Sequence, residues 1–456
     1  MFNIFPKKLI LLEAESKLEN LSHAERVVYW TIVLTPLWWV LGVQTLLYPG
    51  VALYLLAYDF HIDKLVKRSL PLCNWTWLLL SIAVLWTNIQ GLSSISFNPM
   101  KSAALMVTLL KGYFLVFSCL TLPFWHRIRM SVVTRAVSWM TAGYLVSLGI
   151  QILILFGTGP QKAIMPPLAK AIPGDKLSLM VKFAVFQPFF GLPLARTELY
   201  TADPPILGVC ALLCFFMCFG EADKYLRKYA LAGCTATLII AQSRLAWICF
   251  PLALLAVICF RKASARQGFL WFSTLICFIC ALIGMEVTEL LDKPMETFNG
   301  ARADSSKDRA LVVAATLKAW KESPWIGWGI VERTVTWGNG AFELPLGTFS
   351  TYAQILYLHG IFGFAFFAIA VSITLWFFWQ PALRGKRTAQ RAFASFIALL
   401  ILCQATNLSW MIVYFWFYFL WLGTILAEAY PQYVSSWKEL SGNNDRTSYI
   451  DTTNKS

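Results

Sequence analysis

The chain has 456 residues, of which 58% are hydrophobic and only 14% are charged, and it contains 20 tryptophans and 34 phenylalanines. This composition is too apolar for an ordinary soluble globule and predicts a polytopic membrane protein. The net charge of +14 does not indicate nucleic-acid binding, because Lys and Arg gather in short segments between apolar runs, where they set membrane orientation.

Apolar runs of membrane-spanning length predict an all-α bundle of about twelve transmembrane helices with a large, partly helical outer loop. The stretch Val27–Phe60 is too long for one span and is divided at Pro49-Gly50, so two spans are expected there, with the count open by one pair. The other spans are expected near residues 73–90, 102–124, 137–157, 204–219, 229–242, 244–260, 268–288, 351–379, 391–408 and 411–430.

Short loops rich in Lys and Arg alternate with loops that carry few, which predicts that both termini are cytoplasmic. The basic loops hold Lys64, Lys67 and Arg68; Arg127, Arg129 and Arg135; Lys224, Arg227 and Lys228; Arg261, Lys262 and Arg266; and Arg384, Lys386, Arg387 and Arg391. The long polar segments 158–203 and 289–350 then lie outside. The expected divisions are a cytoplasmic segment 1–26, a bundle 27–288, an outer loop 289–350, C-terminal spans 351–430 and a cytoplasmic tail 431–456.

Cysteine and histidine usage argues against a metal centre. All eleven cysteines lie in apolar runs, and the four histidines are scattered through the chain. The pair Cys277 and Cys280 has CxxC spacing but sits in the middle of an expected span without a flanking histidine, which favours buried small side chains over a zinc site. We therefore expect no cofactor and no metal.

Two basic residues stand where membrane helices rarely carry charge. Lys111 falls inside the expected span 102–124, where an ammonium group is costly unless it faces protein or water. It either snorkels or pairs internally, or it contacts a substrate. Arg244 lies between two apolar segments with almost no loop, and it is either an anchor at the headgroup level or a functional cation.

Two further arginines lie in the segments expected outside. Arg196 precedes a helix that is expected to start at Pro204, with Asp203 as the cap of that helix. The Arg196 side chain either pairs with Glu198 or Asp203, or it binds an anionic ligand. Arg309 opens a helical pattern, where the helix dipole disfavours a cation unless an anion binds beside it; the alternative is a solvated loop arginine.

Arg196, Arg244 and Arg309 are thus three outward-facing arginines near three helix ends. Arginine stays charged and grips phosphate oxygens with a bidentate fork. The inferred ligand is an anion at the outer membrane surface, and a lipid pyrophosphate fits that description.

Several short motifs together resemble the O-antigen ligase and polymerase family, over roughly residues 190–365. In chain order they are Ser243-Arg244-Leu245-Ala246-Trp247, Asp308-Arg309-Ala310-Leu311, Ser323-Pro324-Trp325-Ile326-Gly327-Trp328-Gly329, Gly347-Thr348-Phe349-Ser350-Thr351-Tyr352 and Leu356-Tyr357-Leu358-His359-Gly360-Ile361-Phe362-Gly363. Each is degenerate by itself. Their order and spacing carry the resemblance.

The resemblance implies a metal-independent, inverting glycosyltransferase of the bacterial cytoplasmic membrane, which acts on its outer face on glycans linked to undecaprenyl pyrophosphate. Outer arginines in such enzymes bind the pyrophosphate and stabilise the leaving group, and this role carries over to Arg244 and Arg309 and, with a weaker motif match, to Arg196. Arg302, Lys307 and Tyr352 are further candidates for substrate contact, together with Lys111. A chain-length regulator and a flippase of the same pathway are expected partners, beside the bilayer.

One position departs from the family pattern. Ligases of this family carry a histidine, the expected base, where this chain has Phe349. His359 lies about 15 Å further along a helix and is a poor substitute. Three explanations are open: a polymerase that deprotonates its acceptor otherwise, another base such as Glu343 or Asp203, or lost activity. We favour a polymerase over a ligase. A transporter or flippase, and a non-catalytic assembly scaffold, are the alternatives from other classes.

Overall fold

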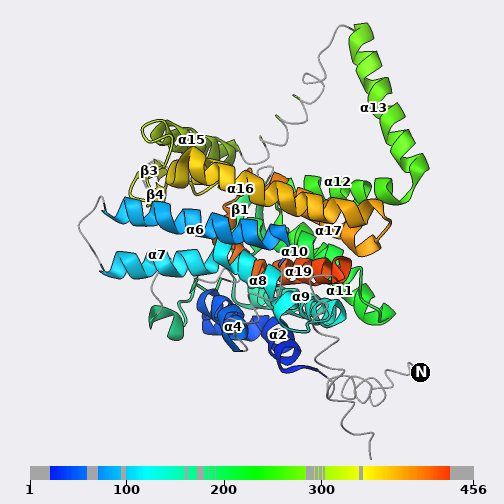
Figure 1. Cartoon of the computed structure of the whole chain (residues 1–456), viewed down its shortest axis with the longest axis horizontal. Helices are drawn as coiled ribbons and strands as arrows, with labels where there is room; N and C mark the ends of the chain where they lie inside the picture. Colours follow the sequence, from blue (N-terminus) through cyan, green and yellow to red (C-terminus); the bar gives the residue numbers. More distant parts are fainter. Residues whose placement is uncertain are drawn as a thin grey trace, which may run out of the picture.

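The computed structural model describes residues 21–58, 70–93, 99–159, 163–171, 179–182, 184–189, 192–283, 303–337 and 342–431, with the single positions 292, 296 and 300. It confirms a mostly helical membrane protein (Figure 1). The elements are α2 (His23–Val33), α3 (Thr35–Leu41), α4 (Gln44–Tyr58), α6 (Leu72–Ser93), α7 (Pro99–Lys111), α8 (Tyr113–Trp125), α9 (Met130–Thr158), η1 (Leu168–Ala171), β1 (Ala184–Phe189), β2 (Leu192–Thr197), α10 (Pro204–Cys218), α11 (Lys224–Ala241), α12 (Arg244–Arg261), α13 (Ala263–Ile283), α15 (Ala303–Trp320), β3 (Thr334–Trp337), β4 (Phe342–Pro345), α16 (Thr351–Leu383), α17 (Arg387–Leu402), α18 (Leu408–Met411), η3 (Ile412–Phe415) and α19 (Trp416–Ala429).

Seven helical segments among the described residues are long and apolar enough to cross a membrane. They are Leu72–Ser93, Lys101–Trp125, Met130–Gly157, Arg244–Arg261, Ala263–Ile283, Thr351–Leu383 and Leu408–Ala429. The expected count of about twelve is not confirmed. Other apolar helices are short: α10 has 15 residues, or about 22 Å of helix, against a hydrocarbon core of about 30 Å. The region Val27–Phe60 forms three short helices over its described part instead of two spans.

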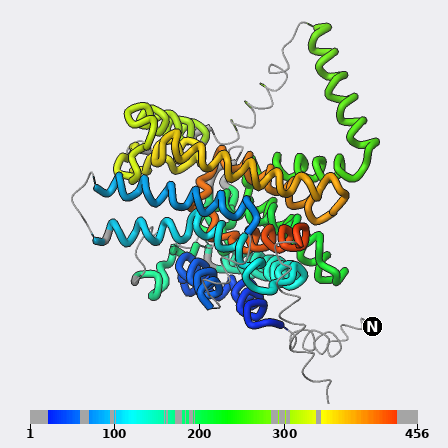
Figure 2. The backbone as a smooth tube through the Cα atoms, in the orientation of Figure 1, coloured from blue at the N-terminus to red at the C-terminus, as the bar shows by residue number. Residues whose placement is uncertain are grey.

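The centre of the bundle is made by α10 and α19, which are apolar on all sides (Figure 2). A helix that is apolar all round has to be covered by other helices or by lipid, and here protein covers both: nearly every residue of α10 and of α19 is buried. Helix α13 behaves differently. It extends away from the bundle in Figure 1, and most of its apolar side chains are exposed.

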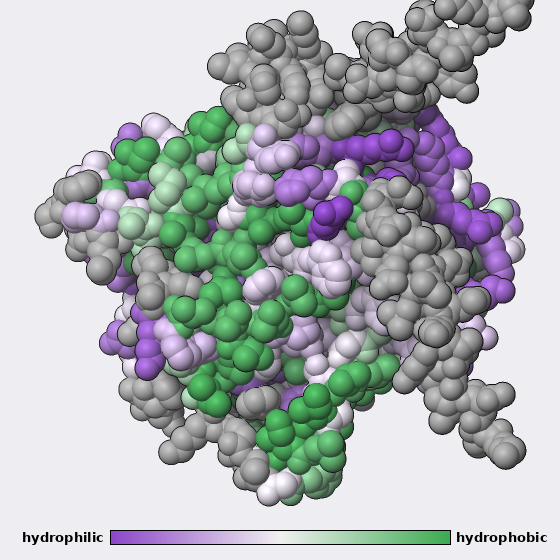
Figure 3. Space-filling view, turned by 90° about the horizontal axis from the view of Figure 1, so that it is seen from below, coloured by the Kyte–Doolittle hydropathy of each residue, from purple (hydrophilic) through white to green (hydrophobic). Residues whose placement is uncertain are grey.

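The surface agrees with an environment of lipid. Seen from below, apolar residues cover much of the middle of the molecule, and polar residues lie toward its edges (Figure 3). Since a soluble monomer rarely exposes apolar patches beyond a few hundred Å², we assign this band to the membrane.

Two of the long helices are broken. The span expected at 102–124 is divided at Gly112 into α7 and α8, so Lys111 ends a half-helix instead of lying within a continuous one. The stretches on both sides of Gly112 are largely apolar, so the hydropathy of the sequence gives no sign of this break. The long helix α16 is interrupted at Gly360, whose φ is 61°, in the expected Gly360/Gly363 region.

The segment 324–329, from the long polar segment between α13 and α16, fills the break in α16. Four backbone hydrogen bonds join them: Ile361 N–H to Pro324 O, Phe362 N–H to Trp325 O, Trp328 N–H to Tyr357 O, and Gly329 N–H to Leu358 O, with lengths of 2.7–3.1 Å. Every donor and acceptor that the break frees inside apolar surroundings needs such a partner. These four hydrogen bonds therefore attach the segment 324–329 to α16.

The long polar segments 158–203 and 289–350 also contain two small antiparallel hairpins, β1–β2 and β3–β4, which the all-α expectation did not include. The first hairpin pairs Val185 with Arg196, and it lies in the long polar segment 158–203, for which no strand was expected. The strands are only four to six residues long. β1 and β2 show no period-two pattern, and the alternation of polar and apolar residues in β3 and β4 is too short to mark a strand by itself.

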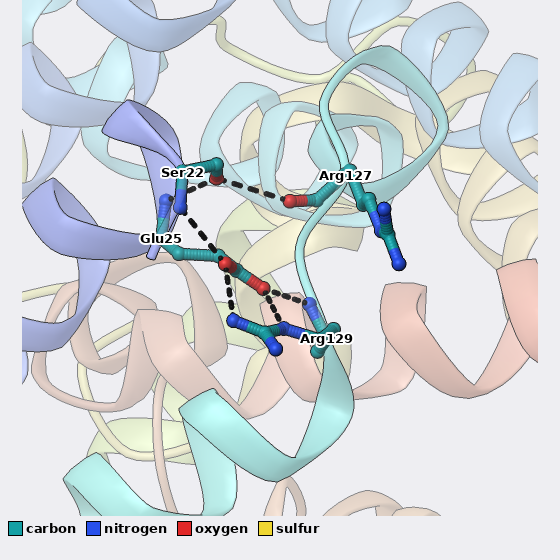
Figure 4. Close-up of polar contacts among 4 residues, drawn as sticks. All are labelled: Ser22, Glu25, Arg127 and Arg129. Atoms are coloured by element: carbon teal, nitrogen blue, oxygen red, sulfur yellow. Dashed lines mark hydrogen bonds and ion pairs between the residues drawn. The ribbon is translucent and has the colours of Figure 1, made fainter. Parts of the chain in front are cut away.

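At the opposite end of the bundle, a charged contact fixes α2 to the start of α9 (Figure 4). The Glu25 carboxylate, 2% exposed, accepts hydrogen bonds from the Arg129 guanidinium at 2.6 and 2.8 Å and from the Ser22 N–H at 3.1 Å. Burial alone would raise the pKa of Glu25, but these hydrogen bonds outweigh it and the pKa lies below its ordinary value. Arg129 is one of the cations of the basic loops.

Candidate functional site

Arg244 and Arg309 come together from two different helices. Arg244 is the first residue of α12, and its guanidinium donates to the Ser306 hydroxyl of α15 at 3.0 Å. Arg309 lies three residues after Ser306, on the same face of α15. The two cations are close enough for the charge of Arg309 to act on Arg244. Two like charges held this close create an electropositive spot where α12 and α15 begin.

Arg309 is held by two further contacts. Its guanidinium donates to the carbonyl of Ala405, in the turn after α17, at 3.2 Å. The guanidinium carbon also lies 4.9 Å from the centre of the Phe349 ring, a cation–π arrangement. Burial lowers the pKa of Arg309, and the negative charge of Asp203 opposes that shift. Arginine starts from so high a pKa that the side chain remains a cation at neutral pH.

The loop that presents Phe349 is built by glycine and by hydroxyl contacts. Gly347 has a φ of 85°, which favours glycine, and a Cβ there would lie 2.9 Å from the side chain of Gln354. Its N–H donates to the Thr316 hydroxyl of α15 at 3.0 Å. Ser350 then caps α16 by accepting from the Ala353 N–H. This loop is thereby fixed to the same helix that carries Arg309.

Arg196 has a different position. It is 5% exposed, and its guanidinium donates to the carbonyls of Ala241 at 3.1 Å and Gln242 at 3.4 Å. These carbonyls end α11 just before Arg244. Gln242 has a φ of 49°, so the turn adopts a conformation that non-glycine residues rarely take, and Arg196 supports it. The structure favours a positioning role for Arg196, through the turn that presents Arg244.

Acidic groups lie beside this cluster. Asp203 stands at the N-terminal end of α10, and its charge reaches both Arg309 and Glu198. Glu198 is 3% exposed; burial raises its pKa to about 7, although the Lys182 ammonium at 3.5 Å works against the shift. Sequence reasoning treated Glu198 only as a partner of Arg196. The position of Glu198 between Arg196 and Asp203 was the one sign in the sequence that it belongs to this cluster. The burial of its side chain could not be predicted from the sequence.

The other proposed base lies elsewhere. Glu343 is exposed on β4, where it accepts from the Thr334 hydroxyl at 3.2 Å across the hairpin. No described contact joins Glu343 to either arginine of the pair. His359, 5% exposed, is bonded through Nδ1 to the Thr87 hydroxyl of α6 at 2.6 Å, in agreement with a packed histidine.

The remaining predicted residues are dispersed. Lys111 is 8% exposed at the end of α7, where a cation complements the helix dipole. Lys307 is exposed on α15. The Tyr352 hydroxyl donates to the Leu400 carbonyl at 2.8 Å, which favours a structural role. Arg302 lies outside the described residues.

Comparison with known proteins bears on this region. Residues 229–368 match the family model described as O-antigen ligase. The matched segment includes Arg244, Arg309 and Phe349 and leaves out Arg196 and Asp203. No curated protein matches the chain at a significant level. The resemblance inferred from short motifs is thereby confirmed.

Proposed function

We propose, on the premise that the chain is a member of the O-antigen ligase/polymerase family, that it transfers a glycan from undecaprenyl pyrophosphate to a sugar hydroxyl on the outer face of the cytoplasmic membrane. The family acts on lipid-linked glycans in the membrane. The lipid carrier, the compartment, the inverting course and the independence from metal are parts of the proposal.

The observation that carries the proposal is the meeting of Arg244 and Arg309. Two guanidinium groups offer two planar forks, which match the two phosphate groups of a pyrophosphate. An anion between them relieves the repulsion of the like charges. Because the pair lies next to apolar surroundings at a helix end, each contact is worth more than it would be in water.

The same geometry supports a reaction. The acceptor hydroxyl attacks the anomeric carbon from the face opposite to the pyrophosphate, and the bond between that carbon and the pyrophosphate oxygen breaks. The electron pair leaves with the pyrophosphate, where Arg244 and Arg309 stabilise the developing charge. Attack from the opposite face inverts the anomeric configuration. The glycan is thus joined to the acceptor, and undecaprenyl pyrophosphate is released.

The hydroxyl proton needs an acceptor, and Phe349 cannot take it. We propose Asp203, because its carboxylate acts on Arg309, whereas no contact among the described residues joins Glu343 to either arginine. General-base help is worth about 10²–10⁴-fold, so a reaction assisted mainly at the leaving group tolerates a weak base. With phenylalanine in the histidine slot, we favour polymerisation of repeat units over ligation.

The proposal is tested by reconstitution. Purified protein in lipid is given undecaprenyl-pyrophosphate-linked repeat units without nucleotide sugar or metal, and the products are sized on a gel. A ladder of longer lipid-linked glycans supports a polymerase, and transfer only to an added lipid acceptor supports a ligase. If neither product forms, a transport or scaffolding function replaces the proposal.

A further inference from the structure

A cavity of about 320 Å³ lies apart from the arginine pair. It is bounded by α6, by α7 up to its break at Gly112, by the start of α16, and by the segment Gly329–Glu332. Its volume is at the low end of the range for small-molecule sites, about 300–1,000 Å³. The mouth carries the ion pair Lys101–Glu332, with 3.6 Å between Nζ and the carboxylate and both side chains about half exposed.

The lining combines apolar side chains with uncharged hydrogen-bonding groups. Apart from the ion pair Lys101–Glu332, the polar members are Asn88, Thr108, Tyr113, Gln354, His359 and Ser409. No arginine is among the described residues that line the cavity, so its chemistry differs from that of the Arg244–Arg309 pair. Amides and hydroxyls without a net charge suit a ligand that offers hydroxyl groups, and the apolar walls suit the C–H faces of a sugar ring.

Two polar side chains that line the cavity, those of Asn88 and Tyr113, have no hydrogen-bond partner among the described residues. Asn88 is 7% exposed, and its side chain makes no hydrogen bond to them. Burying an amide without a partner costs about 1–3 kcal/mol. An isoprenoid chain filling the cavity would cut the Asn88 amide off from water and impose that cost, whereas a hydroxylated ring would offer the amide a hydrogen-bond partner. The lining therefore favours a sugar over a lipid tail.

One wall of the cavity is shared with the arginine cluster. The Ser409 hydroxyl lies 3.3 Å from Gln354 Oε1 and 2.8 Å from Asn407 Oδ1. The Asn407 amide in turn donates to the Gly347 carbonyl at 3.5 Å. Phe349 and Ala405 are the two residues that contact Arg309. Gly347 lies two residues before Phe349, and Asn407 lies two residues after Ala405, so the two ends of the Asn407–Gly347 hydrogen bond are close in sequence to both contacts.

We propose that this cavity binds the acceptor, as an uncharged, hydroxyl-bearing sugar ring. This inference rests on the proposed function and adds a second substrate site to it. The donor pyrophosphate lies at the arginine pair, and the acceptor ring enters between α6 and α7. The wall made by Gln354, Ser409 and Asn407 sets the ring beside the reacting carbon, where the hydroxyl attacks as described above.

The test fills the cavity from one wall. Ala104 lines it, whereas Ala103 is exposed on the same helix and does not line it. Protein in lipid nanodiscs is labelled with a panel of uncharged octyl glycosides that carry a photoreactive diazirine, and undecaprenyl pyrophosphate binding is measured in parallel. Ala104→Trp is expected to reduce glycoside labelling at least about tenfold, with unchanged pyrophosphate affinity, and Ala103→Trp to leave both unchanged.

A second variant tests the same cavity in case Ala104→Trp fails to fold. Asn88→Leu keeps the volume of the side chain and removes its hydrogen bonds, and it is expected to reduce labelling by about tenfold. Wild-type labelling in both Ala104→Trp and Asn88→Leu would overturn the inference. Loss of undecaprenyl pyrophosphate binding in Ala104→Trp would assign the cavity to the lipid carrier instead. Arg309→Ala separates the two proposals: unchanged pyrophosphate affinity there refutes the donor site, whatever the cavity binds.

Discussion

The ring of Phe349 lies against the guanidinium of Arg309, with 4.9 Å from its centre to the cation. At this position the resembled ligases carry a histidine that can move a proton. Phenylalanine cannot, but its ring face attracts a cation and holds it in one orientation. Phenylalanine at position 349 therefore removes a group that could act as an acid or base. In its place, the ring orients Arg309, the residue that we propose to stabilise the leaving group.

The role of the Phe349 ring is open to a direct test. Phe349→Leu removes the aromatic face while keeping an apolar side chain, and Phe349→Tyr keeps the face as a matched control. A cation–π contact is worth about 0.5–2 kcal/mol, so Phe349→Leu should slow glycan extension roughly 2- to 30-fold, and Phe349→Tyr should stay near wild type. The measurement is the initial rate in the reconstituted assay. Equal rates for the two variants would show that the ring does not orient Arg309.

Glu198 gives a pH dependence of known sign. Its pKa in the folded protein is about 7, above the ordinary value, so the folded state binds the proton more tightly than the unfolded state. The stabilisation is present at pH below the ordinary pKa of about 4.3 and is lost as pH rises toward 7. Glu198→Gln cannot titrate. Thermal unfolding in detergent should show wild type losing stability relative to Glu198→Gln between about pH 5 and 7. Parallel curves would contradict the raised pKa.

At the scale of the elements, the break in α16 decides where the segment 324–329 attaches, and the break at Gly112 separates α7 from α8. Gly360 was visible in the sequence because glycine recurs three residues later inside an apolar run. Gly112 was not, because the residues around it are as apolar as any span and the Ser409 carbonyl that faces it is distant in the chain. Hydropathy depends only on residue type, so it does not reveal tertiary contacts that interrupt a helix.

The break at Gly360 predicts a large difference between two glycines. A Cβ at Gly360 would overlap the carbonyl of Trp325, and φ there is positive, whereas Gly385 has a positive φ of 81° but open space around it. Gly360→Ala should therefore displace the segment 324–329 and lower the melting temperature strongly. Gly385→Ala should cost only about 1 kcal/mol, from backbone strain alone. The check is thermal unfolding of both variants in the same detergent, and similar losses would contradict the filled break.

For the whole molecule, the sequence predicted the membrane class, the resemblance to the O-antigen ligase family and the two arginines that meet. It did so because composition and short motifs are local properties. The number of membrane spans was harder to predict from the sequence. Short buried helices such as α10 are as apolar as helices that cross the membrane, so composition does not distinguish the two. The role of Arg196 and the cavity beside α7 depend on contacts between distant segments, which one sequence does not reveal.

Orientation remains a prediction from the basic loops, and cysteine labelling tests it. In a cysteine-free background, Lys307→Cys places a thiol on the exposed surface of α15, and Lys224→Cys places one at the exposed start of α11. An impermeant thiol reagent added to intact cells should label Lys307→Cys and spare Lys224→Cys until the cells are opened. The reverse pattern would place the arginine pair on the cytoplasmic side and remove the proposed reaction from the outer face.

The central claim is that Arg244 and Arg309 together hold a pyrophosphate. The most direct measurement compares the affinities of the protein for undecaprenyl pyrophosphate and undecaprenyl monophosphate, in wild type and in Arg244→Ala, Arg309→Ala and Arg309→Lys. Hydrogen bonds to charged groups are worth about 1.5–3 kcal/mol, so wild type should prefer the pyrophosphate by roughly 10- to 100-fold. Each variant, including Arg309→Lys, should lose most of this preference, since a point charge lacks the fork. An unchanged preference in all three would contradict the account.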